Sequence, residues 1–188
     1  DDPLANVYAG EMTKWFDTNY HFIVPEVDAA TTFQLHADKL IEQIKQTRSQ
    51  GYEVKPVVLG PVSYLYLSKE KDNSDKIALL DDLLNTFAEL LTRLEKAGVE
   101  WVQIDEPALV LQLDEKWKLA YRYAYKQLAQ SKVKVLLATY FGDIQDSLDL
   151  ITDLPVEGVH IDAVRGKASV EPLLSQLPEE TVLSLGVI

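Results

Sequence analysis

Short apolar segments alternate with longer segments of helical periodicity along most of this chain. The apolar segments have the length and composition of strands and lie at residues 21–24, 54–59, 101–104, 133–138, 159–162 and 182–185. Apolar residues at three- and four-residue intervals predict helices at 32–49, 75–97, 115–130, 144–152 and 170–176. Because the connections are long enough for parallel crossovers, this alternation predicts an α/β sheet covered by helices.

Two architectures fit this alternation: an open doubly wound sheet and a (β/α) barrel. No glycine-rich dinucleotide motif follows any of the predicted strands, which favours the barrel. A complete barrel has about 250 residues and eight strands, whereas this chain has 188 residues. We therefore predict an incomplete (β/α) barrel of the TIM type, with residues 1–188 as one partial domain. Gly60 and Pro61 are expected to form a turn, and residues 68–74 a polar loop.

The charge of the chain argues against two classes of partner. It carries 18 Lys and Arg against 30 Asp and Glu, a formal net charge of −12. Nucleic acids and anionic membrane surfaces are bound by clustered cations, so neither is expected as a partner. The sequence shows no apolar run long enough to span a bilayer and no signal peptide, and it does not begin with Met. We expect a cytoplasmic protein that is part of a longer one.

The chain contains no cysteine and only three histidines. A zinc site that needs a thiolate ligand is therefore excluded, and no calcium-loop spacing is present. We expect no metal or other cofactor to be bound by this chain.

Polar residues occupy alternate positions near the ends of two predicted strands. Side chains alternate between the two faces of a strand, so Gln103 and Asp105 share one face, as do His160 and Asp162. The intervening apolar residues should face the helices, which leaves these four polar side chains in the barrel lumen, with Thr139 close to them. They form either a polar pocket at the barrel mouth or a hydrogen-bonded network that serves only the fold.

The adjacent pair Asp105 and Glu106 should point to opposite faces and cannot act together on one substrate atom without a bulge. Near the start of the chain, Lys14 lies among Trp15, Phe16 and Tyr20. A lysine flanked by aromatic residues can hold a carboxylate ligand, or it can lie extended over packed rings.

Four segments, in order and spacing, resemble the N-terminal barrel of cobalamin-independent methionine synthases. They are EMTKWFDTNYHFIVPE at 11–26, KPVVLGPVSYL at 55–65, EWVQIDEPAL at 100–109 and TYF at 139–141. The resemblance implies a zinc-dependent methyltransferase that moves a methyl group from 5-methyltetrahydrofolate polyglutamate to homocysteine. It also implies a second, catalytic barrel as partner, which holds the zinc and is absent from this sequence.

The resemblance also implies roles for individual residues. Lys14 stands where the family has a lysine that contacts the folate polyglutamate tail. Asp162 stands where the catalytic barrel has a zinc-ligating Glu, and residues 138–141 stand where it has His-x-Cys, so zinc is not expected here. Asp105 belongs to an Asp-Glu-Pro motif that both barrels share. The family's basic Arg-Glu-Leu-Lys motif is absent, so folate binding by this chain should be very weak.

Three hypotheses follow for function. The chain is a scaffold and tail-binding part of a methionine synthase, inactive alone; or a stand-alone, non-catalytic binding or assembly module; or a separate small enzyme that uses Gln103, Asp105, His160 and Asp162. A barrel that lacks strands exposes unpaired sheet edges, so we also expect either a homodimer that covers them or marginal stability.

Overall fold

A five-stranded parallel sheet forms the centre of the structure. The computed structural model describes residues 10–187. The strand order is β4-β6-β7-β8-β9, and every neighbouring pair is parallel. The strands are β4 (Val57–Leu59), β6 (Trp101–Asp105), β7 (Lys134–Ala138), β8 (Gly158–Asp162) and β9 (Val182–Gly186). Five of the segments predicted as strands therefore form this sheet.

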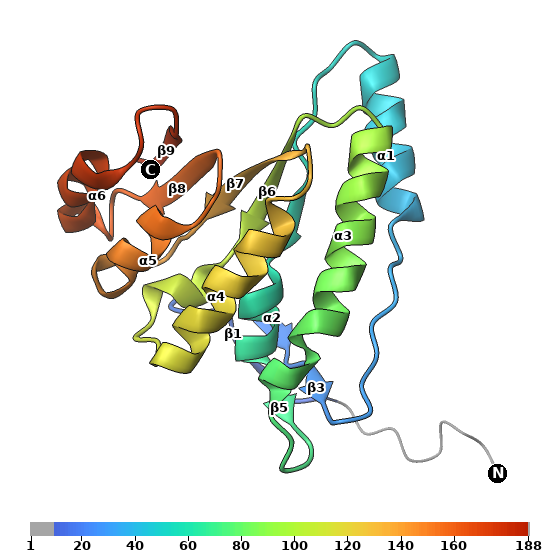
Figure 1. Ribbon diagram of the computed structural model, residues 1–188, viewed down its shortest axis with the longest axis vertical. Coiled ribbons are helices and arrows are strands. Elements are labelled where there is room, and N and C mark those ends of the chain that lie inside the picture. The colour runs from blue at the N-terminus through green and yellow to red at the C-terminus, as the bar shows by residue number, and fades with distance from the viewer. Residues whose placement is uncertain (1–9, 188) are drawn as a thin grey trace.

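Helices join successive strands of the sheet (Figure 1). They are α3 (Leu80–Lys96), α4 (Glu115–Leu128), α5 (Leu148–Asp153) and α6 (Val170–Gln176), and α1 (Asp38–Ser49) precedes β4. The strand order follows the chain order without reversal. A doubly wound sheet reverses its order at a switch point, whereas barrel strands are sequential. The predicted fold class, an incomplete (β/α) barrel, is confirmed.

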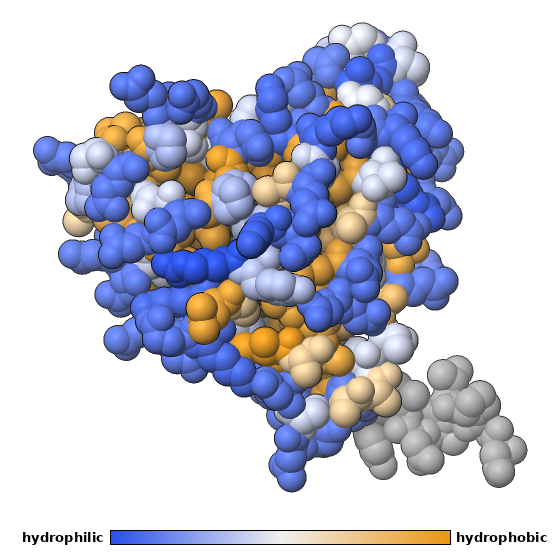
Figure 2. Space-filling view, in the orientation of Figure 1, coloured by the Kyte–Doolittle hydropathy of each residue, from blue (hydrophilic) through white to orange (hydrophobic). Residues whose placement is uncertain are grey.

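The two faces of the sheet differ in burial as the sequence predicts. Val102 and Ile104 of β6 and Val159 and Ile161 of β8 are buried in the core that the helices cover. The residues between them are only partly buried and lie on the opposite face, here called the lumen face. Figure 2 shows the helix side, where hydrophilic residues cover most of the surface and hydrophobic residues appear between them.

The predicted strand at 21–24 does not join this sheet. Residues His21–Ile23 form β2, which pairs antiparallel with β1 (Met12–Lys14) in a separate hairpin. The turn between them is held locally, because the Thr18 hydroxyl donates to the carbonyl of Trp15 at 2.6 Å. Within the predicted loop at 68–74, Lys69–Glu70 forms β5, which pairs in parallel with β3 (Glu26–Val27).

Several helices begin later than their periodicity predicts, or begin with a 3₁₀ turn. The predicted helix at 32–49 begins only at Asp38, because Phe33 instead packs edge-on against the Tyr64 ring at 6.0 Å. The predicted helix at 75–97 opens with a 3₁₀ turn before α3. The 3₁₀ turns are η1 (Lys76–Leu79), η2 (Pro107–Val110), η3 (Gln145–Ser147) and η4 (Lys167–Ser169).

The prediction of a simple turn at Gly60 and Pro61 is wrong. Pro61–Leu67 forms helix α2, with Gly60 at its N-cap and Pro61 at its first position. Gly60 has no side chain to accept hydrogen bonds from the first helical amides, so the local sequence lacks the usual N-cap signal. The missing acceptor comes from a distant residue, Glu106, described below.

Within residues 10–187, no helix is long and apolar enough to cross a membrane.

Candidate functional site

The lumen face carries the predicted polar residues in adjacent rows of the sheet. The register places Asp105, Ala138, His160 and Ser184 in one row across β6, β7, β8 and β9. Gln103 lies one row nearer the start of its strand, opposite Leu136. Gln103, Asp105 and His160 therefore lie on neighbouring rows of one face, and Asp162, two residues after His160, lies on the same face in the next row, as strand parity requires.

A chain of hydrogen bonds runs along the end of β6. The Lys55 ammonium donates to Oε1 of Gln103 at 2.7 Å, and Nε2 of Gln103 donates to Oδ1 of Asp105 at 2.8 Å. The Tyr140 hydroxyl donates to Oδ2 of Asp105 at 3.2 Å. Both carboxylate oxygens of Asp105 thus have a donor. We call Lys55, Gln103, Asp105, Tyr140 and His160 the lumen cluster.

His160 lies beside this chain without a direct bond to it. Its Nδ1 is 2.8 Å from the Ser184 hydroxyl, which fixes the orientation of the ring. Burial lowers the pKa of His160, and the positive charge of Lys55 lowers it further. Burial also raises the pKa of Asp105, against the opposing effect of its two hydrogen-bond donors. Both side chains therefore favour the neutral state more than they would in water.

Thr139 and Asp162 are separate from the lumen cluster. The buried Thr139 hydroxyl donates to the main-chain carbonyl of His160 at 3.2 Å. Oδ1 of Asp162 accepts from the amides of Val164 and Arg165, both at 2.9 Å, and so shapes the turn after β8. Asp162 acts on His160 only through its charge, which raises the pKa of that histidine.

Lys14 lies on the exposed β1–β2 hairpin, next to the carboxyl ends of the sheet strands. Asp17 in the hairpin turn pairs with Arg165, which follows β8, at 3.6 Å. A hydrogen bond from the Trp15 side chain to Tyr140, which follows β7, lowers the pKa of that tyrosine, whereas burial and the charge of Asp105 raise it. The hairpin therefore lies at the mouth of the partial barrel, on the same side as the lumen cluster.

One face of the hairpin is both cationic and apolar. Lys14 is directly opposite His21, and Met12 is directly opposite Ile23. Met12 and Ile23 are 67% and 68% exposed. Lys14 forms no ion pair with any other residue in the described part of the chain. The lysine does not lie buried over packed rings and is accessible to a ligand.

Glu106, which the sequence did not single out, is fully buried on the other side of β6. Its carboxylate accepts from the Ser63 amide at 2.7 Å and the Val62 amide at 3.4 Å, at the start of α2. The hydroxyls of Tyr121 and Tyr125 donate to it at 3.1 and 3.2 Å. As predicted, Asp105 and Glu106 point to opposite faces. In the sequence, Glu106 stands out only as part of the Asp-Glu-Pro motif. Its role could not be predicted from that motif, because its partners lie on α2 and α4.

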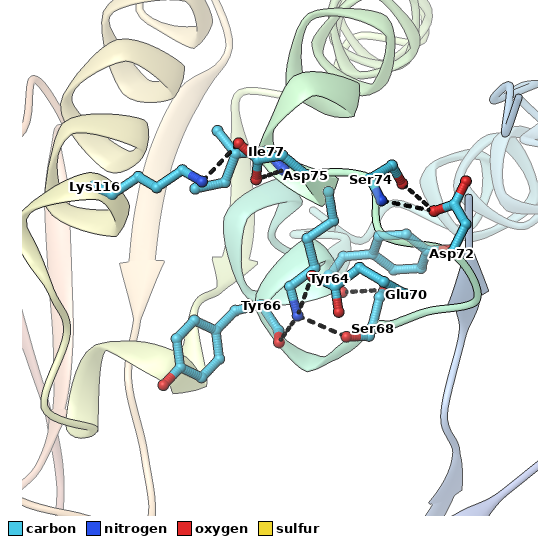
Figure 3. Close-up of polar contacts among 10 residues, drawn as sticks. Tyr64, Tyr66, Ser68, Glu70, Asp72, Ser74, Asp75, Ile77 and Lys116 are labelled. Carbon is cyan, nitrogen blue, oxygen red and sulfur yellow. Dashed lines mark hydrogen bonds and ion pairs between the residues drawn. The ribbon is translucent and has the colours of Figure 1, made fainter. Parts of the chain in front are cut away.

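The end of α2 is held by a side chain from the 3₁₀ turn that follows it in the chain. The Lys76 ammonium donates to the carbonyls of Tyr66 and Ser68 at 2.9 and 2.7 Å, and lies 3.8 Å from Glu70. Figure 3 shows these partners together with Asp75, which accepts from Lys116. Burial lowers the pKa of Lys76. Both ends of α2 are therefore capped by side chains outside the helix, the start by the distant Glu106 and the end by the nearby Lys76.

The described residues do not fit a zinc site. No three His, Asp or Glu side chains in residues 10–187 are grouped so that they could hold a metal ion. Cysteine is absent from the whole chain. The zinc that the family resemblance implies for the second barrel has no ligand set among the described residues.

The sequential strand order and the polar lumen define a protein of the (β/α) barrel class, with a hydrogen-bonded cluster at the barrel mouth. A family model described as cobalamin-independent synthase, N-terminal domain, matches residues 4–188. The chain belongs to this family.

Solved structures of similar fold include two methyl-transfer enzymes. A methyltransferase from Methanosarcina mazei is 16% identical with a TM-score of 0.57; the match covers 78% of this chain and 57% of that one. A B12-independent methionine synthase from Shewanella is 16% identical with a TM-score of 0.50, covering 88% and 63%. A chitinase from Rhizomucor miehei is 17% identical with a TM-score of 0.52, covering 87% and 62%. These likenesses support the fold, and the chain spans less than two thirds of each relative.

Proposed function

We propose that this chain is the scaffold and folate-tail-binding part of a cytoplasmic methyltransferase that moves a methyl group from 5-methyltetrahydrofolate polyglutamate to homocysteine. The observation that carries the proposal is Lys14, exposed on a hairpin at the barrel mouth of a chain that belongs to the cobalamin-independent synthase family. The catalytic centre and its zinc would be supplied by a second barrel, and this chain alone would have no turnover.

The hairpin offers the chemistry that a polyglutamate tail requires. An accessible ammonium can pair with a tail carboxylate, and the exposed Met12 and Ile23 offer apolar contact beside it. A single exposed ion pair contributes only about 0–1 kcal/mol. Because one such pair is all that the described hairpin offers, the chain by itself should bind the tail very weakly.

The lumen cluster supports a structural role in this proposal. Both oxygens of Asp105 and the Oε1 of Gln103 already have donors within the chain. The Ser184 hydroxyl lies 2.8 Å from Nδ1 of His160, but among the described residues no carboxylate hydrogen-bonds the histidine ring to orient it as a general base. We assign it the role of joining β6 to its neighbours at the barrel mouth.

The proposal is tested by following the amide NMR signals of the chain during titration with 5-methyltetrahydrofolate triglutamate. We expect shifts confined to the β1–β2 hairpin, with a dissociation constant of about 1 mM or weaker. Lys14→Met should abolish them, whereas Lys126→Met, which removes an exposed lysine of α4, should not. Micromolar affinity, or shifts that survive Lys14→Met, would contradict the assignment.

Two further measurements separate the alternatives. Methyl transfer to homocysteine by this chain alone that is lost in Asp105→Ala would identify a separate enzyme instead. An immunoblot of the source cells should show a band several times larger than 21.2 kDa if the chain is part of the full methyltransferase. A band near that mass would indicate a stand-alone module.

A further inference from the structure

Glu106 is a buried acid without a cationic partner. Among residues 10–187 it is the one Asp, Glu, Lys, Arg or His side chain in the buried class. No Lys, Arg or His in that range forms an ion pair with it, and its four partners are two amides and two hydroxyls. A buried charge normally has an opposite charge beside it, so this arrangement requires an explanation.

The hydrogen bonds of Glu106 favour the ionised state. An ionised carboxylate is acceptor-only, and all four neighbours can donate to it. The 2.7 Å bond from the Ser63 amide is as short as charge-assisted bonds are. The carboxylate thereby replaces the side chain that Gly60 lacks at the N-cap of α2.

The neighbouring side chains can also accommodate Glu106 in its protonated state. The Tyr121 hydroxyl lies 3.1 Å from both Oε2 of Glu106 and the Ser63 hydroxyl. A protonated Oε2 can donate to Tyr121, which then donates to the Ser63 hydroxyl, so the added proton has an acceptor. In that state Oε2 is a weaker acceptor for the Ser63 amide. Burial favours this neutral state, so two opposing effects act on one group.

Glu106 is linked to the lumen cluster through its neighbour in the chain. The carbonyl of Asp105 accepts from the Gly60 amide at 2.7 Å, and the amide of Glu106 donates to Ala138 at 2.8 Å. The start of α2 is therefore attached to β6 twice, by the main chain of Asp105 and by the side chain of Glu106. A change in the second attachment acts directly on the residue whose side chain lies in the lumen.

We propose that Glu106 is a proton-linked positioning residue, which binds the start of α2 tightly when ionised and loosens it when protonated, and so shifts Asp105 in the lumen cluster. The proposal concerns the fold of this chain and does not depend on the ligand assigned to Lys14.

The electrostatics of the site support this inference. Burial raises the pKa of Glu106 from 4.5 to about 7, against the lowering effect of its hydrogen-bond donors. Tyr121 and Tyr125 of α4 face it, and their pKa values are raised well above the usual range by burial and by its charge. The two tyrosines therefore keep their protons and remain hydrogen-bond donors to Glu106. Three other titratable groups interact with this network through their charges. Asp105 raises the pKa of Tyr125 and Tyr66 raises that of Tyr121, whereas Glu106 itself raises the pKa of Tyr140.

The sign of the linkage follows from the raised pKa. Between about pH 4.5 and 7 the folded chain retains a proton that the unfolded chain has released, so folding takes up a proton. Burial of the charged carboxylate costs more free energy than its tighter bonds to α2 return, so the stability of the fold is highest at the lower pH and falls as the pH rises toward 7. The folded-to-unfolded ratio should fall by about two to three orders of magnitude across this window.

The direct test is an amide NMR titration of the folded chain from about pH 5 to about pH 8. The Ser63 amide proton should move downfield with a midpoint near 7, as its acceptor becomes a carboxylate. The side-chain amide of Gln103, which donates to Asp105, should show an inflection at the same midpoint. Both should be absent in Glu106→Gln, whose side chain does not titrate.

A Ser63 signal that is flat over this range would overturn the proposal. A titrating Ser63 with a Gln103 signal that lacks the shared inflection would overturn the link to the lumen. If Glu106→Gln does not fold, Tyr125→Phe provides the second variant. It removes one donor to the carboxylate, so the Ser63 midpoint should move to higher pH, and an unchanged midpoint would contradict the assignment of the titration to Glu106.

Discussion

Gly60 and Glu106 are in direct contact, although they lie on separate strand–helix units. A methyl group added at Gly60 would collide with the carboxyl group of Glu106. The contact allows the carboxylate to reach the amides of Val62 and Ser63. The glycine before α2 and the acid after β6 therefore work as one unit, and the segments at 55–65 and 100–109 meet in the fold.

The first prediction is that Gly60→Ala strongly destabilises the chain. The added methyl group displaces Glu106 and leaves buried polar groups without partners, so the free energy of unfolding should fall by about 2–4 kcal/mol. Urea unfolding followed by circular dichroism measures this change.

Gly51→Ala is the matched control. Gly51 has a φ of +87° and no neighbouring atom within 4 Å, so alanine there adds only backbone strain, about 1 kcal/mol. Equal costs at the two glycines would show that the collision with Glu106 contributes nothing.

The second prediction concerns the other end of α2. Lys76→Met removes the ammonium that donates to the carbonyls of Tyr66 and Ser68. Leaving these acceptors unpaired should lower the free energy of unfolding by about 1–3 kcal/mol. Lys126→Met, at an exposed lysine, should change it by less than about 0.5 kcal/mol. A similar small effect at both lysines would contradict the capping role.

The third prediction is that Tyr140→Phe raises the pKa of Asp105 still further. The Tyr140 hydroxyl donates to the carboxylate and so lowers that pKa, against the larger effect of burial. Its removal should move the midpoint to higher pH, measured by carbon-13 NMR of the Asp105 carboxyl group. Tyr20→Phe, at a tyrosine that is 73% exposed, is the control and should leave the midpoint unchanged.

The fourth prediction concerns the open edges of the sheet. β9 is an edge strand of the described sheet, and Val182 and Leu185 within it and Val187 directly after it are 49%, 40% and 69% exposed. Unpaired edge strands favour pairing with another chain. We expect reversible self-association in sedimentation experiments, weakened by Leu185→Lys. Leu119→Lys, at an exposed leucine of α4, should not weaken it; equal effects would exclude β9 as the interface.

Much of the fold could be predicted because it depends on local periodicity. The burial of Val102 and Ile104 and the lumen orientation of Gln103 and Asp105 follow from strand parity alone, and the structure confirms both. The strand at 21–24 was assigned to the wrong sheet, because its apolar pattern does not specify which strand it pairs with.

The role of Lys14 remains a proposal after the structure is known. The structure places it at the barrel mouth and exposed, which fits an anionic ligand. The assignment itself comes from the resemblance of the segment at 11–26 to the family.

The sequence by itself determined the class of the chain: alternating apolar and helical periods require parallel strands joined by helices, whatever the contacts between them. Only the tertiary structure decided the helix at 61–67 and the role of Glu106. The amides at the start of that helix need an acceptor that Gly60 cannot provide, and the acceptor comes from the end of another strand. Because a hydrogen bond between distant segments depends on how the strands align in the sheet, no local pattern could reveal it.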